Sequence, residues 1–356
     1  MRDDPYSRLR EFLDLLPLGF PRTSAGVEIR ILKRLFTEEE ARLAVNLTPF
    51  AEDVAQISAR ARRDEAEIEP MLESMAGKGL IFRMRRQGKA LFNVAPFMIG
   101  LYEYSVKKID KELAALFKEY YECAYLDEMG ASNIPGFKVL PVEENIRADT
   151  VLLPFYRIEE SIRGARRIAV AECICRKEAR LTGGGCDAPL ETCLNFGVAA
   201  EFYIENGMGR EITAEEAIEI VLKADRAGLV HAGVNTKHLS NICNCCSCCC
   251  ASMKGITRRG HDKHKYMNAL FEARIDPDTC VACEACVERC PVGAIASGDP
   301  PWVHREKCLG CGLCAGVCPT KAITLHLRED REEPFERVLD MGLKILEGKK
   351  TQTGRP

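Results

Sequence analysis

The chain has 356 residues, of which 46% are hydrophobic and 29% charged, as expected for a globular protein of two or three domains. Its net charge of −3 excludes a general attraction to nucleic acid or to anionic membranes. No apolar run is long enough to cross a bilayer, and residues 1–6 lack the apolar core of a secretory signal, so a cytoplasmic protein is expected. Nineteen cysteines in such a chain indicate metal ligation rather than disulfides.

A small helical domain that ends in a β-ribbon is predicted for residues 1–98. Apolar side chains at three- to four-residue spacing and several capping patterns indicate the helices. The predicted elements are a helix over 26–36, a helix opened by the capping box Thr37–Glu40, a helix over 50–61 started by Thr48 and Pro49, a helix capped by Asp64 that ends at Gly77, and strands over 80–82 and 90–94. Helices and a ribbon in this order resemble a winged helix-turn-helix domain.

One long helix is predicted from residue 97 to about residue 128, and a connecting segment over 99–148 contains most of it. The apolar residues that recur along it are Val106, Ile109, Leu113, Leu116 and Tyr120. A helix of this length beside a winged helix either packs against a partner or a second copy, or covers its own domain. A homodimer through the N-terminal domain and this helix is therefore one expectation.

An α/β domain rich in cysteine is predicted for residues 149–272. Its expected elements are a short helix after Pro154, a buried strand over 167–171, a helix over 194–206, a helix from the capping box Thr213–Glu216 to Gly228, and a strand over 229–231. The first strand leads directly into Cys173 and Cys175. Because sites form at the carboxyl ends of strands in α/β folds, we expect a site there.

Ten cysteines lie in this domain, and six of them fall within eight residues. They are Cys173, Cys175, Cys186, Cys193, Cys243, Cys245, Cys246, Cys248, Cys249 and Cys250. Metal binding is favoured over a set of free buried thiols, because clustered thiols without a metal are prone to oxidation. Adjacent cysteines such as Cys245 and Cys246 point to different sides. Both can therefore ligate only with unusual geometry or in two separate sites.

At least one further iron–sulfur cluster is expected in this domain, and zinc is the rival metal because it also takes four thiolates. Arg176 would offset thiolate charge, and the glycines at 183–185 would let the backbone approach a cluster closely. Three histidines flank the cysteines, namely His238, His261 and His264. A solvated or structural role is the better expectation for them.

Two copies of the spacing C-x2-C-x2-C-x3-C-P follow, starting at Cys280 and at Cys308. The cysteines are Cys280, Cys283, Cys286 and Cys290 in the first copy and Cys308, Cys311, Cys314 and Cys318 in the second. Three thiolates at i, i+3 and i+6 on a curling loop can reach different irons of one cube. The fourth, followed by proline, begins a short helix and cannot curl back. Zinc sites use pairs of C-x2-C, so a structural zinc site is disfavoured here.

This motif resembles that of bacterial 2[4Fe-4S] ferredoxins over about residues 274–327. The resemblance implies a ferredoxin-like module over 273–327 with two [4Fe-4S] clusters, in which the fourth cysteine of each copy ligates the other cluster. The implied ligand sets are Cys280, Cys283, Cys286 and Cys318 for one cluster, and Cys308, Cys311, Cys314 and Cys290 for the other. Residues 328–356 are expected to form a last helix, over 335–346, and a tail.

Taken together, these patterns predict an α+β multidomain protein. A winged helix, a Cys-rich α/β domain and a double-cluster ferredoxin in one chain resemble multidomain 4Fe-4S binding proteins of anaerobic prokaryotes. That resemblance implies redox work in an anaerobe and names no substrate.

The first functional hypothesis is an electron carrier or electron-transfer subunit that passes single electrons between a low-potential donor and an oxidoreductase partner. The second is a redox-responsive transcription regulator, which is disfavoured because the candidate recognition helix is acidic. Its acids are Asp64, Glu65, Glu67, Glu69 and Glu73, whereas the ribbon is basic, with Arg83, Arg85, Arg86 and Lys89. A third hypothesis is catalysis at a non-standard cluster in the middle domain. No acid–base pair or nucleotide fingerprint supports it, so a non-catalytic redox component is the main expectation.

Overall fold

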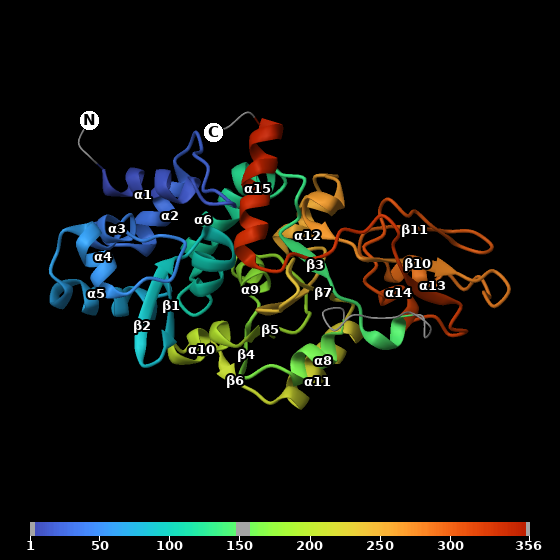
Figure 1. Cartoon of the computed structure of the whole chain (residues 1–356). Coiled ribbons are helices and arrows are strands. Elements are labelled where there is room, and N and C mark those ends of the chain that lie inside the picture. Colours follow the sequence, from blue (N-terminus) through green and yellow to red (C-terminus); the bar gives the residue numbers. More distant parts are fainter. Residues whose placement is uncertain (1–3, 147–156, 354–356) are drawn as a thin grey trace.

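The computed structural model describes residues 4–146 and 157–353. Figure 1 shows three parts in a row: the N-terminal helices and their ribbon, a mixed sheet in the middle, and a C-terminal module at the opposite end. Within the described ranges, no helix is both long enough and apolar enough to cross a membrane.

The N-terminal region (residues 4–96) consists of helices followed by one antiparallel ribbon. Its elements are α1 (Pro5–Asp14), α2 (Val27–Leu35), α3 (Glu38–Ala44), α4 (Val54–Ala61), α5 (Glu65–Gly77), β1 (Ile81–Arg86) and β2 (Lys89–Val94). The capping box Thr37–Glu40 is confirmed, with both of its hydrogen bonds present. The predicted start at Thr48 is wrong, because Asp53 caps α4 in a box with Gln56 and the Thr48 hydroxyl instead accepts from the N–H of Phe50.

Residues 97–129 form an aromatic segment that is broken into short pieces. These are η1 (Phe97–Leu101), η2 (Glu103–Ser105), α6 (Lys111–Tyr120), η3 (Tyr121–Tyr125) and α7 (Leu126–Met129). The prediction of one long helix is wrong, because the backbone leaves helical geometry at Gly100 and Asp110 starts a new helix by capping the N–H of Leu113. Phe97, Phe117 and Tyr120 are buried against one another, so the segment covers its own protein.

The central domain is built on a seven-stranded sheet with the order β6-β4-β5-β8-β7-β3-β9. Every pair of neighbours is antiparallel except β3 and β9. The elements in chain order are β3 (Phe137–Val139), η4 (Glu143–Asn145), α8 (Ile158–Arg163), β4 (Ile168–Glu172), α9 (Ile174–Leu181), β5 (Glu191–Phe196), α10 (Val198–Glu205), β6 (Arg210–Glu211), α11 (Ala214–Arg226), β7 (Val230–Val234), β8 (Asn241–Cys245), α12 (Ala251–Thr257), η6 (Lys263–Lys265) and β9 (Met267–Asn268).

Three details of this domain differ from the sequence-based expectation. The strand β3 joins the sheet although it lies in the stretch assigned to a linker. Where a helix was expected over 194–206, the chain instead forms the end of strand β5 and then, after Gly197, α10, and Cys193 lies on β5. The first residues of the helix expected after Pro154 lie outside the described residues, and α8 supplies its second half.

The C-terminal module (residues 271–327) is small and has its own core. Its elements are β10 (Phe271–Ile275), α13 (Ala285–Arg289), β11 (Ile295–Ala296), β12 (Trp302–Val303), α14 (Leu313–Gly316) and β13 (Ile323–Leu327). The strands β10 and β13 pair, as do β11 and β12. Buried Phe271, Ala294 and Leu325 form the core together with cysteine side chains.

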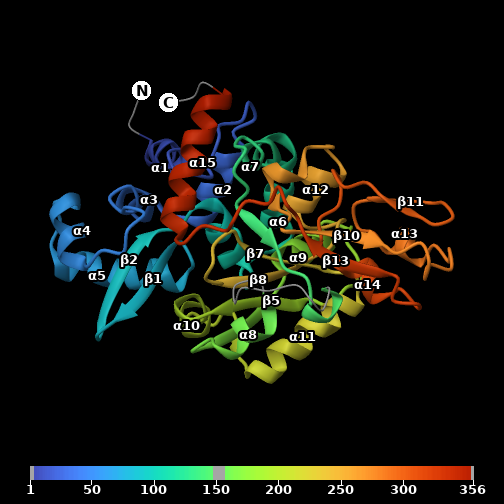
Figure 2. The same cartoon turned by 45° about the vertical axis from the view of Figure 1, so that its right-hand side comes forward.

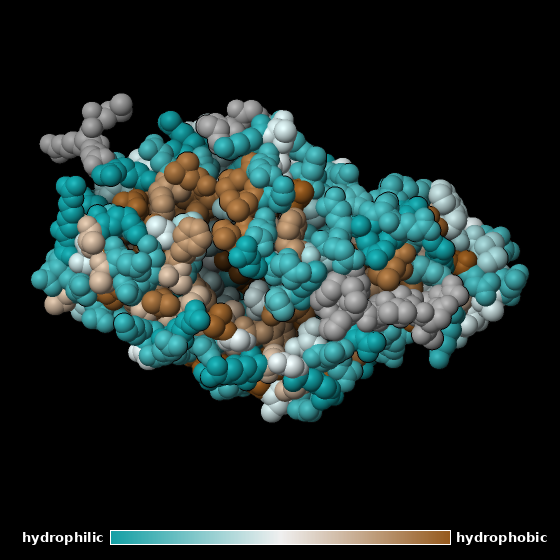
Figure 3. Space-filling model, in the orientation of Figure 1, coloured by the Kyte–Doolittle hydropathy of each residue, from teal (hydrophilic) through white to brown (hydrophobic). Residues whose placement is uncertain are grey.

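The chain then returns across the molecule as α15 (Val338–Thr353), which runs seven residues beyond the predicted end. Figure 2 shows α15 beside α1, far from the module that precedes it. Buried Lys349 pairs with Glu128 and reaches the carbonyl of Pro17. Exposed apolar side chains gather where these helices meet, among them Leu15, Leu339 and Leu343, and Figure 3 shows this apolar area against a mostly hydrophilic module.

Candidate metal centres

The structure sorts eighteen of the nineteen free cysteines into four groups, two in the module and two in the central domain. The remaining one, Cys123, lies exposed on η3, where its thiol reaches the carbonyl of Tyr120 at 3.7 Å. Among the described residues, His238, His261 and His264 do not line any of the four groups. His261 instead contacts the hydroxyl of Tyr266 at 2.6 Å, as a structural histidine would.

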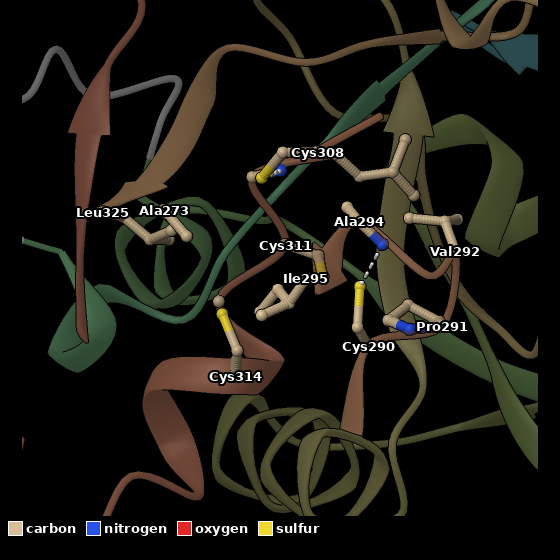
Figure 4. Close-up of a pocket in the computed structure, with 13 residues that line it drawn as sticks. Ala273, Cys290, Pro291, Val292, Ala294, Ile295, Cys308, Cys311, Cys314 and Leu325 are labelled. Carbon is tan, nitrogen blue, oxygen red and sulfur yellow. Dashed lines mark hydrogen bonds between the residues drawn. The ribbon is translucent and has the colours of Figure 1, made fainter. Parts of the chain in front are cut away.

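The inner pocket of the module brings the fourth cysteine of the first motif to the second motif. Cys308, Cys311 and Cys314 line it together with Cys290, around about 340 Å³ of space that is partly open to solvent (Figure 4). The backbone N–H of Ala294 donates to the sulfur of Cys290 at 3.1 Å. Such N–H groups stabilise negative charge on a thiolate and tune the reduction potential of a cluster.

The outer pocket has the converse composition. Cys280, Cys283 and Cys286 line it together with Cys318, around about 310 Å³ of space. Cys283 is exposed, and its neighbour Val281 keeps 61% of its surface in solvent. Each pocket thus contains the four cysteines that the ferredoxin resemblance assigns to one cluster.

Local backbone geometry explains why the module can wrap its pockets so closely. Gly310 has φ +66°, and a Cβ at this position would lie 2.1 Å from the carbonyl oxygen of Phe271. Only glycine can occupy such a position. In this backbone conformation the N–H of Gly310 donates to the sulfur of Cys308 at 3.4 Å.

The buried thiols of the inner pocket also favour a positively charged ligand. Burial raises the pKa of Cys311 to about 12 and raises that of Cys314 still further. A thiolate at either position is therefore unfavourable unless positive charge stands beside it, which iron supplies. The residues present fit iron–sulfur clusters.

The largest of the four groups surrounds a chamber inside the central domain. Six cysteines line it: Cys173 after β4, Cys175 on α9, Cys193 on β5, Cys243 and Cys245 on β8, and Cys250 before α12. Strand pairing brings them together, since Ala171 is opposite Cys193 and Leu194 is opposite Ile242. Cys246 reaches the wall of the chamber as well.

The six thiols of the chamber stand close enough to share protons. Thiol donors on Cys193 and Cys245 lower the pKa of Cys243, and those on Cys175 and Cys245 lower the pKa of Cys250. Contacts with Cys173 and Cys250 raise the pKa of Cys175, and contact with Cys243 raises the pKa of Cys193 and of Cys245. Thiols alone can therefore be only partly deprotonated here, and a full set of thiolates needs bound metal.

Arg176 is the buried cation of this region. Its guanidinium donates to the carbonyl of Asn244 at 2.8 Å and to the hydroxyl of Thr192, while its Nε has no hydrogen-bond partner among the described residues. Burial by itself would lower the pKa of Arg176, but the negative charge of Cys173 and Cys246 raises it overall. The sequence-based expectation that this arginine offsets thiolate charge agrees with its position.

Sequence analysis missed several residues of the chamber wall. Glu103 comes from η2, and desolvation raises the pKa of its carboxyl to about 8, so this acid is neutral at pH 7. Thr192 and Asn244 also line the wall. A lone acid within the apolar run from Phe97 to Tyr104 was the available signal for Glu103, whereas the other two have no pattern that distinguishes them.

The fourth group is a compact four-thiol site made of Cys186, Cys246, Cys248 and Cys249. All four sulfurs lie within 4.8 Å of one another. Cys186 and Cys246 are 3.8 Å apart, and Cys248 and Cys249 are 3.6 Å apart. Adjacent cysteines are thus divided between two sites, since Cys245 and Cys250 face the chamber while Cys246 and Cys249 join this site.

Comparison with known proteins identifies the module alone. A family model described as a 4Fe-4S dicluster domain matches residues 273–325. A search of curated proteins finds no match to the chain. The C-terminal module is therefore of the iron–sulfur ferredoxin type, and it points to iron–sulfur electron transfer.

Proposed function

We propose that this chain is an iron–sulfur electron-transfer protein, or a subunit of one, that passes single electrons between a low-potential donor and an oxidoreductase partner. The observation that carries the proposal is the pair of four-cysteine pockets in the module, one at the exposed tip and one against the central domain. A [4Fe-4S] cluster supplies one-electron storage at a potential set by its surroundings. With four cysteines at each pocket, the module offers no open ligand position for a substrate.

The inner pocket faces the central domain because specific contacts hold it there. Leu309 and Leu313 belong to the same buried core as Met253 of α12. Arg289, next to Cys290, donates to the carbonyls of Asp225 and Arg226 at 2.6 and 2.8 Å. These contacts fix one pocket against the interior and leave the other for a partner.

A short series of polar groups connects the inner pocket to the chamber. The side-chain amide of Asn244 donates to the carbonyl of Thr192 at 2.6 Å, so its oxygen must accept from Nδ1 of His231, also at 2.6 Å. Nε2 of His231 then lies 3.6 Å from Asp225, whose carbonyl accepts from Arg289. This buried series offers a route for electronic coupling between the two regions.

We further propose that the six-cysteine chamber holds at least one additional iron–sulfur cluster. Support comes from the crowded thiols, from buried Arg176 and from the redox module beside the chamber. Structural zinc is the rival, and acid-labile sulfide distinguishes the two because zinc sites contain none.

The partner surface is proposed at the tip of the module, around the outer pocket. Val281 and Trp302 are exposed there, at 61% and 54% of their surfaces, and Pro301 lines the pocket beside Trp302. An exposed aromatic beside a redox centre suits docking of a redox protein. The N-terminal region would serve as scaffold, either in the monomer or in a homodimer.

The alternative function, DNA binding, is disfavoured by the ion pairs of the β-ribbon. Arg83 and Arg85 both form ion pairs with Glu73 and with Glu205 of α10, so these cations face carboxylates of their own chain. Arg60 is likewise paired with Glu52. In a fluorescence-anisotropy titration at about 150 mM salt, we expect no specific binding to random or upstream DNA; sequence-dependent binding near 10⁻⁸ M would favour the regulator instead.

The main proposal is tested by anaerobic redox titration of the full chain with methyl viologen as mediator. We expect about two electrons to enter the module, one for each cluster, with EPR signals of reduced [4Fe-4S] centres. Anaerobic co-purification should also recover an oxidoreductase. A chain that takes up no electrons between about −700 and +450 mV, the range of such clusters, would refute the electron-transfer function.

A further inference from the structure

We infer that the four-thiol site binds a single metal ion, Zn²⁺ or Fe²⁺, and not a cluster. The site supplies four thiolates, the number that a tetrahedral ion takes, from Cys186, Cys246, Cys248 and Cys249. The inference concerns a site outside the module and next to the chamber, whose wall Cys246 also reaches, and it does not depend on the electron-transfer function.

The spacing of the sulfurs decides between an ion and a cube. A tetrahedral metal–sulfur bond of about 2.3 Å requires sulfurs about 3.8 Å apart. The separations of 3.8 Å for Cys186 with Cys246 and 3.6 Å for Cys248 with Cys249 agree with this value. In a cube each thiolate binds a different iron, which forces the sulfurs farther apart.

The module provides an internal comparison for this argument. Among the described residues, the four-thiol site is the only group of potential ligands whose atoms all lie within 4.8 Å of one another. The cysteines of the outer and inner pockets, which the dicluster match assigns to cubes, do not approach one another so closely. The two kinds of site therefore differ in the size of the occupant that they fit.

The surrounding chain supports such an ion. Ser247–Cys249 forms a turn after β8, and Cys186 comes from the loop after α9. Arg180 donates to the carbonyls of Cys186 and Ala188 at 2.9 and 2.8 Å, which holds that loop in place. The ion would join two segments that lie sixty residues apart in sequence.

The test uses anaerobically produced full-length protein and its Cys248→Ser variant, with Cys123→Ser as the matched control. The wild type should contain one metal equivalent in excess of acid-labile sulfide. Cys248→Ser should lose that equivalent while its sulfide stays unchanged, and Cys123→Ser should lose neither. Metal analysis by mass spectrometry identifies the ion as zinc or iron.

A spectroscopic measurement on the wild type keeps the inference testable if the variant does not fold. X-ray absorption at the zinc edge should show four sulfurs at about 2.3 Å and no metal neighbour. If the ion is iron, Mössbauer spectra should show a mononuclear tetrathiolate iron. Absence of both signals, or loss of about four irons with four sulfides from Cys248→Ser, overturns the inference.

A second inference, which rests on the proposed further cluster, concerns the size of that cluster. We infer that the chamber takes an iron–sulfur cluster larger than one [4Fe-4S] cube. Six cysteines line the chamber, whereas four line each pocket of the module.

The number of ligands carries this inference. Four thiolates complete one cube, and the chamber provides six. With a single cube in the chamber, two thiols would be left without metal. The cation Arg176, whose Nε has no partner among the described residues, is placed to donate to additional sulfide.

Iron and sulfide analysis of the full chain tests this second inference. The comparison is between wild type and a Cys173→Ser/Cys243→Ser variant, again with Cys123→Ser as control. A difference of about eight irons and a similar amount of sulfide supports the larger cluster. A difference of four overturns it but leaves the proposed further cluster intact, whereas a difference of zero overturns both.

If the chamber variant does not fold, native mass spectrometry of the wild type under anaerobic conditions decides the question. The cofactor mass should exceed that of three [4Fe-4S] cubes plus one metal ion. A mass at or below that value overturns the larger cluster.

Discussion

The C-terminal module and the central domain hold similar numbers of cysteines, eight and ten, but they assemble them in opposite ways. The module takes all its cysteines from one stretch of about forty residues, Cys280–Cys318. The central domain collects its cysteines from separate segments, namely 173–175, 186, 193 and 243–250. The first arrangement is a local motif, whereas the second depends on how the sheet is paired.

This difference has consequences for what maintains each site. Loop spacing and glycine geometry create the two pockets of the module, so they should persist when remote contacts are lost. The chamber depends on the alignment of β4, β5, β7 and β8, where Ala171 is opposite Cys193 and Ala232 is opposite Cys243. Changes far from the chamber in sequence should therefore disturb it while leaving the module intact.

The largest expected effect tests how the module divides its cysteines. Replacing Cys318 by Ala should abolish the cluster of Cys280, Cys283 and Cys286, because Cys318 lines their pocket. Replacing Cys290 by Ala should abolish the other cluster. EPR of the reduced variants, with Cys123→Ala as control, measures which signal is lost.

The opposite result is well defined. If Cys318→Ala kept the cluster of Cys280–Cys286 and lost that of Cys308–Cys314, each motif would ligate its own cluster. The module would then follow sequence order alone, and the resemblance to bacterial ferredoxins would fail at its most specific point.

The next effect concerns the close backbone packing of the module. Gly310→Ala should lower its free energy of unfolding by ~3 kcal/mol and reduce iron at the inner pocket, because the new Cβ meets the Phe271 carbonyl at 2.1 Å. The control is Gly88→Ala in the β-ribbon, where φ is +78° but no atom lies within 4 Å. That change should cost only about 1 kcal/mol of backbone strain. Equal effects in denaturant unfolding would show that steric contact is unimportant.

A third substitution tests whether the stability of the central domain is independent of that of the module. Arg176→Met should destabilise the central domain by ~3 kcal/mol, because the carbonyl of Asn244 and the charged thiols lose a buried partner. Arg176→Lys, which keeps the charge but not the planar fork, should lose less. Amide hydrogen exchange should report the loss in β4 and β8, with β10 and β13 unchanged. Uniform loss throughout the chain would contradict the division into two independent regions.

The same contrast between the module and the central domain decides what the sequence could predict. The motif Cys280–Cys318 was sufficient to expect a ferredoxin-type module, because its ligands are close in sequence and their spacing is constrained by iron geometry. The sequence-based argument also allowed two outcomes for Cys245 and Cys246, unusual geometry in one site or two separate sites, and the structure has the second. Alternation of side chains along an extended backbone was enough for that step.

The partition of the ten central cysteines could not be predicted. It requires the strand order β4-β5-β8-β7, which is not sequential, and nothing in a single sequence specifies that order. The predicted long helix failed for a related reason: apolar spacing was present, but Gly100 and Asp110 interrupt it locally. The resemblance of the N-terminal region to a winged helix stays a prediction.

The smallest expected effect tests whether the N-terminal ribbon supports the central domain. The side chain of Arg83 on β1 is only 7% exposed and pairs with Glu205 of α10 at 2.7 Å. The ring of Phe82 contacts that of Phe202, on the same helix, in a tilted arrangement with the centroids 4.8 Å apart. The helix α10 follows β5, which carries Cys193, so the ribbon contacts the chamber through one helix and one strand. Arg83→Ala should therefore weaken α10 and β5 by about 1–2 kcal/mol, since both carboxylate partners are partly exposed and solvated.

Hydrogen exchange of α10 and β5 amides measures this effect, with Arg86→Ala as the matched control because Arg86 is exposed at the end of the same strand. Exchange should accelerate in α10 and β5 for Arg83→Ala only, and β10 and β13 of the module should not change. The reason is that no contact of the ribbon with the module is needed to hold the local cysteine motif. If β10 and β13 lost protection to the same extent, the module would depend on remote packing as the chamber does, and the contrast between a local and an assembled site would not hold.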